Sequence, residues 1–176
     1  REWICGLLWD KLYRRLLFEE TFFEEGHRID DEYFTYQGIM NARKILRDNR
    51  IVYNYRKRRS SVMYSSQSGR QIVLDRVDFL SKRRMKVGSR YPKLKKVFDK
   101  HFLEAMMILA TDANGSPESI AMIQKQLRSY FREKGHTVPD IRLWPRLTKL
   151  CFDDPEKLLS KRSPEKTGTD LNAYFE

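Results

Sequence analysis

The sequence predicts an α+β fold that is mainly helical and carries a small β hairpin or sheet near the middle of the chain. Two observations support this expectation. Apolar residues recur at helical spacing in several segments of helical length. Three short runs in the middle of the chain are rich in β-branched and aromatic residues, which favour strands. The chain has 176 residues and is 40% hydrophobic, enough to bury a core.

We expect three regions along the chain. Residues 1–88 would form a basic domain, residues 89–160 a small helical domain, and residues 161–176 a flexible tail. The first boundary follows from Val87-Gly88-Ser89-Arg90 with Pro92 close behind, a sequence typical of a break between elements. The tail is rich in Ser, Pro, Lys, Thr and Gly, which disfavour a packed structure.

In the first region the pattern predicts two helices followed by three strands. The first helix covers residues 2–23, and an acidic start precedes the second, which runs over residues 36–48 with Thr35 as its N-cap. The expected strands are residues 51–55, 61–64 and 71–77, with Gly69 in the turn before the last one. Residues 80–88 would be a basic connector or a short helix.

The second region carries clear helix signals. A helix is expected over residues 93–111, with Pro92 in its first turn. Ser116 and Pro117 mark the start of the next helix, which should stop at Gly135. Pro145 is expected to begin a short helix, and Asp154 with Pro155 a last helical turn.

The excess positive charge belongs to one quarter of the sequence. The formal net charge of the chain is +11, and the 14 Lys and Arg residues against 3 Asp residues between Arg43 and Lys86 also give +11. Everything outside that stretch therefore sums to zero. A concentrated positive charge of this kind is typical of a surface that binds a polyanion.

The candidate nucleic-acid-binding residues all fall within or beside that stretch. The 36–48 helix would present Asn41 and three cations on its polar side, and the first hairpin would carry four cations at its tip, where phosphates could bind. The full set is Asn41, Arg43, Lys44, Arg47, Arg50, Arg56, Lys57, Arg58, Arg59, Arg70, Lys82, Arg83, Arg84 and Lys86.

The order helix, break, strand, basic turn, strand over residues 35–77 is similar to that of winged-helix DNA-binding proteins, a helix-turn-helix variant. The resemblance implies double-stranded DNA as partner and a role in replication initiation, mobile-element biology or transcription regulation. The 36–48 helix would enter the major groove, with Asn41 as a possible adenine reader. The expected location is the cytoplasm or nucleoid, or the nucleus in a eukaryote.

Other binding roles remain open. The protein could instead be a subunit of an assembly that meets RNA or an acidic protein, with Tyr53, Tyr55 and Tyr64 stacking on unpaired bases. A homodimer is also possible. Residues 116–150 could form a second helix-turn-helix, although a helical domain that packs on the first region or on a partner is the simpler interpretation. Its cations would be Lys125, Arg128, Arg132, Arg142 and Arg146.

The sequence offers little support for catalysis, a cofactor or a membrane span. Phosphate-loop, dinucleotide-binding, zinc-protease and nucleophile-elbow motifs are absent, and no run of 18 apolar residues occurs. The first residues also become charged too soon for a signal peptide. Cys5 and Cys151 are expected to be free buried thiols. A metal-dependent nuclease would need carboxylates gathered around a histidine, and the nearest candidates are His27, Asp30, Asp31 and Glu32.

Overall fold

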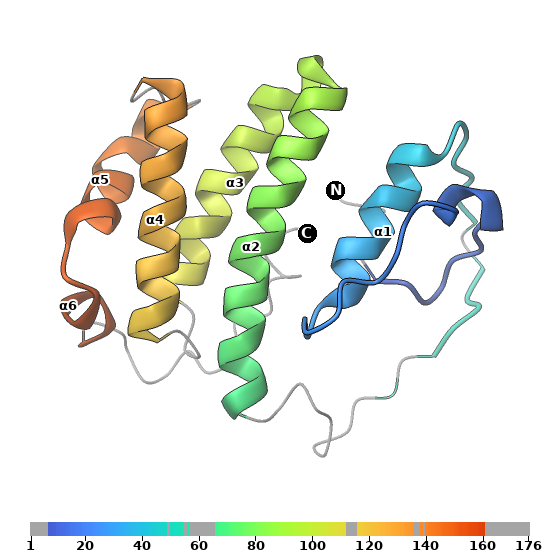
Figure 1. The fold of residues 1–176 in the computed structure, drawn as a ribbon, viewed down its shortest axis with the longest axis horizontal. Helices are drawn as coiled ribbons and strands as arrows, with labels where there is room; N and C mark the ends of the chain where they lie inside the picture. Colours follow the sequence, from blue (N-terminus) through green and yellow to red (C-terminus); the bar gives the residue numbers. More distant parts are fainter. Residues whose placement is uncertain are drawn as a thin grey trace.

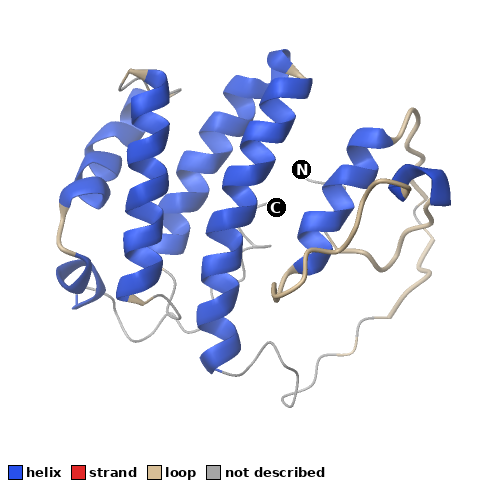
Figure 2. Cartoon of the chain, in the orientation of Figure 1, coloured by secondary structure: helices blue, strands red, loops and turns tan. Residues whose placement is uncertain are grey.

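In the computed structural model, the residues described are 7–48, 50–54, 56, 66–111, 116–135, 138 and 140–160. Within these ranges every regular element is a helix (Figure 2). The expected α+β class is therefore wrong for the described part of the chain. The elements are η1 (Arg15–Phe18), α1 (Asp30–Asn41), α2 (Ser66–Arg90), η3 (Pro92–Leu94), α3 (Lys95–Ala110), α4 (Pro117–Lys134), η4 (Ile141–Leu143), α5 (Trp144–Phe152) and α6 (Pro155–Ser160).

The long helix α2 takes the place of the expected third strand and of the turn at Gly69. Buried apolar residues recur along one face of α2 at spacings of four and three residues, at Val73, Val77 and Leu80. The next, Val87, follows after seven residues, because the charged residue Arg84 occupies the position between them. One helical face, from Val73 to Val87, can therefore pack on α3 and α4. That packing overrides the β propensity of residues 71–77, because strand propensity depends strongly on context.

The expected helix over residues 36–48 is also misplaced. Helix α1 begins at Asp30 and ends at Asn41, and its first turn holds three acidic residues, as the sequence predicted for a helix start. Thr35 is a buried residue inside the helix and not its cap. Ala42 is extended, and residues 42–48 and 51–54 have no regular structure, so the expected strand at 51–55 is wrong for 51–54. The strand at 61–64 lies outside the described residues.

Only a 3-10 turn forms where a helix over residues 2–23 was expected, with residues 1–6 outside the described ranges. Aromatic packing explains the difference. The ring of Phe34 on α1 is stacked between Phe18 at 4.1 Å and Phe23 at 4.2 Å between centroids. The ring of Phe18 also lies directly on Gly38, where a Cβ atom would collide with it. The N-terminal segment thus follows α1 closely instead of continuing as a helix.

The helices of the second region are confirmed. Ser116 caps α4 by accepting a hydrogen bond from the Ser119 amide at 3.2 Å, and Gly135 ends it in the left-handed conformation with φ of 59°. Pro92 and Pro145 lie in the first turns of η3 and α5, and α6 begins at Pro155.

Helix α2 is the centre of the arrangement. Helices α3 and α4 pack on one side of it, α5 and α6 lie beyond them, and α1 lies on its other side (Figure 1). One buried cluster joins these helices, from Tyr33 of α1 through Val77 and Leu103 to Leu147 of α5. The expected boundary after residue 88 falls in the last turn of α2, and the two-domain division stays a prediction. In the described ranges, no helix has the length and apolar character needed to cross a membrane.

Candidate nucleic-acid interface

The second basic run of the sequence is divided by the geometry of α2. Successive residues of a helix point about 100° apart, so Lys82, Arg83 and Arg84 face different neighbours. Each cation of this run therefore has its own surroundings, and the three do not form one patch.

Arg84 faces the core. Its Nη1 and Nη2 donate to Asp99 at 2.9 Å and to Glu133 at 2.6 Å, and its guanidinium lies 5.1 Å from the ring centroid of Tyr130. The side chain is only 10% exposed. Burial opposes the charge, but the hydrogen bonds to the two acids outweigh it and raise the pKa of Arg84. Arg84 is thus a structural group that joins α2 to α3 and α4.

Arg83 faces α3. One guanidinium nitrogen lies 3.1 Å from Nδ1 of His101, and the guanidinium lies over the rings of Phe79 and Phe98 at 4.9 and 5.6 Å. Burial and the neighbouring Arg83 lower the pKa of His101 to about 4, so this imidazole is neutral near pH 7. Arg83 and His101 together act as packing groups.

Lys82 lies between two carboxylates on the α1 side of α2. Its Nζ is 2.6 Å from Glu24 Oε2 and 3.0 Å from Asp78 Oδ2. Partial burial lowers the pKa of Lys82, but the hydrogen bonds to these acids outweigh that effect and raise it. The positive charge of Lys82 is therefore already balanced.

Lys86 and Arg90 follow Lys82 at one-turn intervals on the same face of α2, but their partners are neutral. Lys86 Nζ donates to the side-chain oxygen of Gln37, and Arg90 Nη1 donates to that of Asn41 at 3.0 Å. Neither cation makes an ion pair with a described residue. Amide oxygens satisfy the hydrogen bonds without cancelling the charge, so two uncompensated cations remain beside α1.

The segment after α1 adds further uncompensated charge. Arg43, Lys44 and Arg47 are exposed, and among the described residues none of them has an ion-pair partner. Arg50 differs, because its Nε donates to Asp48 at 2.8 Å. We call residues 43–48, 50–54 and 56 the basic segment, which contains five cations and one acid. Arg56 is exposed in this segment and Arg70 on the first part of α2, while Lys57, Arg58 and Arg59 lie outside the described residues.

The basic segment begins beside the end of α2. Asn41, the last residue of α1, binds Arg90, and the Tyr91 hydroxyl donates to the Met40 carbonyl at 3.0 Å. Arg43 is two residues beyond Asn41, so its Cα lies within about 8 Å of that of Asn41. Arg43 and Lys44 thus follow directly in the chain after the contact between α1 and Arg90, and we call Lys86, Arg90, Arg43 and Lys44 the basic ridge.

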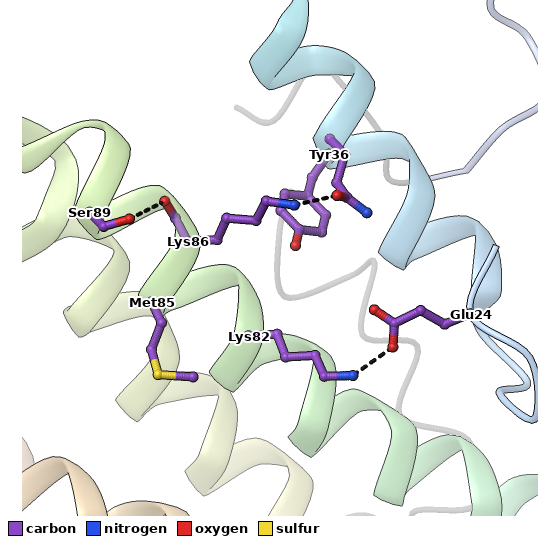
Figure 3. A pocket seen from close by; sticks show the side chains of 7 residues that line it. Glu24, Tyr36, Lys82, Met85, Lys86 and Ser89 are labelled. Carbon is purple, nitrogen blue, oxygen red and sulfur yellow. Dashed lines mark hydrogen bonds and ion pairs between the residues drawn. The ribbon is translucent and has the colours of Figure 1, made fainter. Parts of the chain in front are cut away.

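A shallow groove lies next to the basic ridge, between α1 and α2 (Figure 3). Its volume is about 490 Å³. The Lys82–Glu24 and Lys86–Gln37 contacts cross it from one wall to the other. Its lining residues are Glu24, Tyr36, Gln37, Lys82, Met85, Lys86 and Ser89.

One group of possible metal ligands occurs among the described residues, namely Glu24, His27 and Asp78. Lys82 contacts both of these carboxylates, and His27 Nδ1 lies 3.1 Å from Asp75 Oδ1. An ammonium group thus already supplies the positive charge at this position. The acidic residues 30–32 considered for a nuclease lie in the first turn of α1 and do not join His27 in that group.

Two of the cations in the second region have partners within the described residues. Arg128 donates to the Cys151 carbonyl at 3.2 Å, and Arg142 pairs with Asp140 at 2.7 Å. Cys151 is a free buried thiol, as expected, and burial raises its pKa to about 11. Lys125, Arg132 and Arg146 are exposed on α4 and α5.

Sequence reasoning found Lys86, Arg43 and Lys44 but missed Arg90. Its position four residues after Lys86 was the available signal, since that spacing places both on one helical face. Tyr53, which was expected to stack on unpaired bases, already stacks on a ring of the protein. Its ring lies on that of Trp9 at 4.9 Å between centroids.

Comparison of the chain with protein-family models, with curated proteins and with solved structures finds no match. Its function must therefore be inferred from the residues described above.

Proposed function

We propose that this protein binds nucleic acid through the basic ridge and the rest of the basic segment, and that it acts by binding and not by catalysis. The observation that carries this proposal is the lack of acidic partners around the ridge. Arg43, Lys44 and Arg47 are exposed without an ion pair to a described residue, and the ridge cations Lys86 and Arg90 hold only neutral amides.

The arrangement favours phosphate contacts over base reading. The cations of the segment lie on irregular chain, so they can follow a phosphate backbone but cannot enter a major groove as one helix. The Asn41 amide donates to the Leu17 carbonyl at 2.9 Å and accepts from Arg90, so both ends of the group that would read adenine are occupied. We therefore expect binding with little sequence preference, to DNA or RNA.

The salt dependence of binding tests this proposal. Each phosphate that a cation neutralises contributes about 0.7 to 0.9 to the slope of log affinity against log salt. Replacing Arg43, Lys44 and Arg47 with alanine should then reduce the slope by about 2 to 3, measured by fluorescence anisotropy with a labelled oligonucleotide.

The matched control removes three exposed cations from α4 and α5, namely Lys125, Arg132 and Arg146. This control has the same net charge as the first variant, so it separates a local contact from general attraction. Equal slopes for the two variants, or no binding by the unaltered chain, would contradict the proposal.

A second candidate function is that of a protein-binding subunit in a larger assembly. The basic segment also exposes large apolar side chains, since Leu46 and Ile51 are each 87% exposed and Val52 is 69% exposed. Apolar side chains at this exposure gain from contact with a protein surface. Sedimentation velocity would detect self-association, and a Leu46→Ser, Ile51→Ser variant should abolish it if this segment is the interface.

A further inference from the structure

We propose that the groove between α1 and α2 binds one unpaired nucleotide of a single-stranded nucleic acid, with its phosphate on Lys86 and Arg90. This inference rests on the proposed function and specifies its substrate class. It starts from a feature that the charge count alone does not give, a concave surface with Lys86 at one end and the Glu24 carboxylate, paired with Lys82, at the other (Figure 3).

Lys86, at one end of the groove, and Arg90, one turn beyond it on α2, can accept a phosphate without breaking an ion pair between described residues. Lys86 and Arg90 are one helical turn apart, which places their side chains on the same face with Cβ atoms about 6 Å apart. An ammonium has three donors and a guanidinium five, and the hydrogen bonds to Gln37 and Asn41 use one of each. The remaining donors are available to phosphate oxygens, which bind cations more strongly than amide oxygens do.

The middle of the groove offers surfaces for a base. Met85 of α2, which is 58% exposed, and Tyr36 of α1 both line the groove. A polarisable thioether makes favourable contacts with aromatic rings. Burial raises the pKa of Tyr36, so its hydroxyl keeps its proton and can donate a hydrogen bond.

The far end of the groove provides an acceptor. Oε2 of Glu24 contacts Lys82 at 2.6 Å and His27 at 3.4 Å, while Oε1 makes no hydrogen bond with a described residue. A carboxylate oxygen accepts from the N–H groups on the pairing edge of a base. That edge is free only when the base is unpaired, so Glu24 favours a single strand.

The size of the groove fits the same ligand. Ligand sites are typically about 300 to 1,000 Å³ in volume, and this groove measures about 490 Å³. A stacked base pair cannot enter it, because its bases are held inside the duplex. A duplex would therefore contact the basic ridge through its phosphates alone, and the groove would add affinity only for a single strand.

The test compares one oligonucleotide as a single strand and as a duplex, by fluorescence anisotropy with the full chain. Met85→Asp places a negative charge in the groove at an exposed helical position, where the fold should tolerate it. The matched control is Phe152→Asp, which makes the same charge change at a 76% exposed position on α5. Circular dichroism establishes that both variants are folded.

We expect the unaltered chain to bind the single strand about tenfold more tightly than the duplex, a ratio that corresponds to about 1.4 kcal/mol. Met85→Asp should remove this preference, and Phe152→Asp should retain it. Equal affinity of the unaltered chain for both forms, or equal losses in the two variants, would overturn the groove while leaving the ridge in place. Failure of the unaltered chain to bind either form would overturn both proposals.

Discussion

Replacing Arg84 with methionine should destabilise the fold by about 3 kcal/mol, near the lower end of the cost of removing one partner from a buried ion pair. The guanidinium makes hydrogen bonds of 2.9 Å to Asp99 and 2.6 Å to Glu133, and the substitution removes both. The side chain of Asp99 is only 6% exposed, so water cannot solvate its charge once Arg84 is removed. The value lies at the lower end because Lys134 remains 2.9 Å from Asp99 and because methionine fills much of the volume.

Urea unfolding followed by circular dichroism measures this effect. With a slope of about 2 kcal/mol per molar, the midpoint should fall by about 1.5 M. The matched control is Lys86→Met, two residues away on the exposed side, which should change stability by no more than about 0.5 kcal/mol and should weaken nucleic-acid binding instead. The opposite result, with Arg84→Met stable but defective in binding, would refute the structural role derived for Arg84.

Two further predictions concern histidine titration and helix ends. The pKa of His101 is about 4 in the folded chain and 6.5 in a model compound, so the unfolded chain takes up the proton first and stability should fall as pH drops from about 6.5 to 4. His101→Gln should flatten this part of a urea-midpoint profile, and an unchanged profile would assign the dependence to other groups. Gly135→Ala should cost about 1 kcal/mol, because φ of 59° strains a residue with a Cβ although the space is open; an unchanged thermal midpoint would contradict this.

The second region could be predicted from its sequence because the signals at the helix ends are local. Ser116 and Pro117 satisfy or remove the free amides at the start of α4, and Gly135 takes the backbone conformation that ends it. Helix α2 could not be placed in the same way. Its β-branched residues favour a strand when considered alone, and the stripe that α3 and α4 cover includes a charged residue, Arg84, among the apolar ones.

The sequence predicts which region of the chain carries the candidate site, but not how its side chains are arranged in space. The charge count located the excess cations between Arg43 and Lys86, and the exposed residues Arg43 and Lys44 lie there. What the count could not show is which cations already have acids beside them. Only the Asp78 partner of Lys82 follows a local pattern, the four-residue spacing on α2. Glu24 beside Lys82 and Glu133 beside Arg84 lie 58 and 49 residues away along the chain, and no local pattern indicates such distant partners.

The position of Arg84 has a consequence for how the helices align. Apolar side chains of similar size are interchangeable, so a bundle held by them alone could slip by one turn, about 5.4 Å, at small cost. Here a slip of α2 would place Leu80 or Gly88 opposite Asp99 and leave that carboxylate with Lys134 as its single cation. The observed register is the one that lets Arg84 donate to both Asp99 and Glu133. Arg84 thus selects a single alignment of α2 with α3 and α4. The same alignment fixes where the cations on the opposite face of α2 lie along α1.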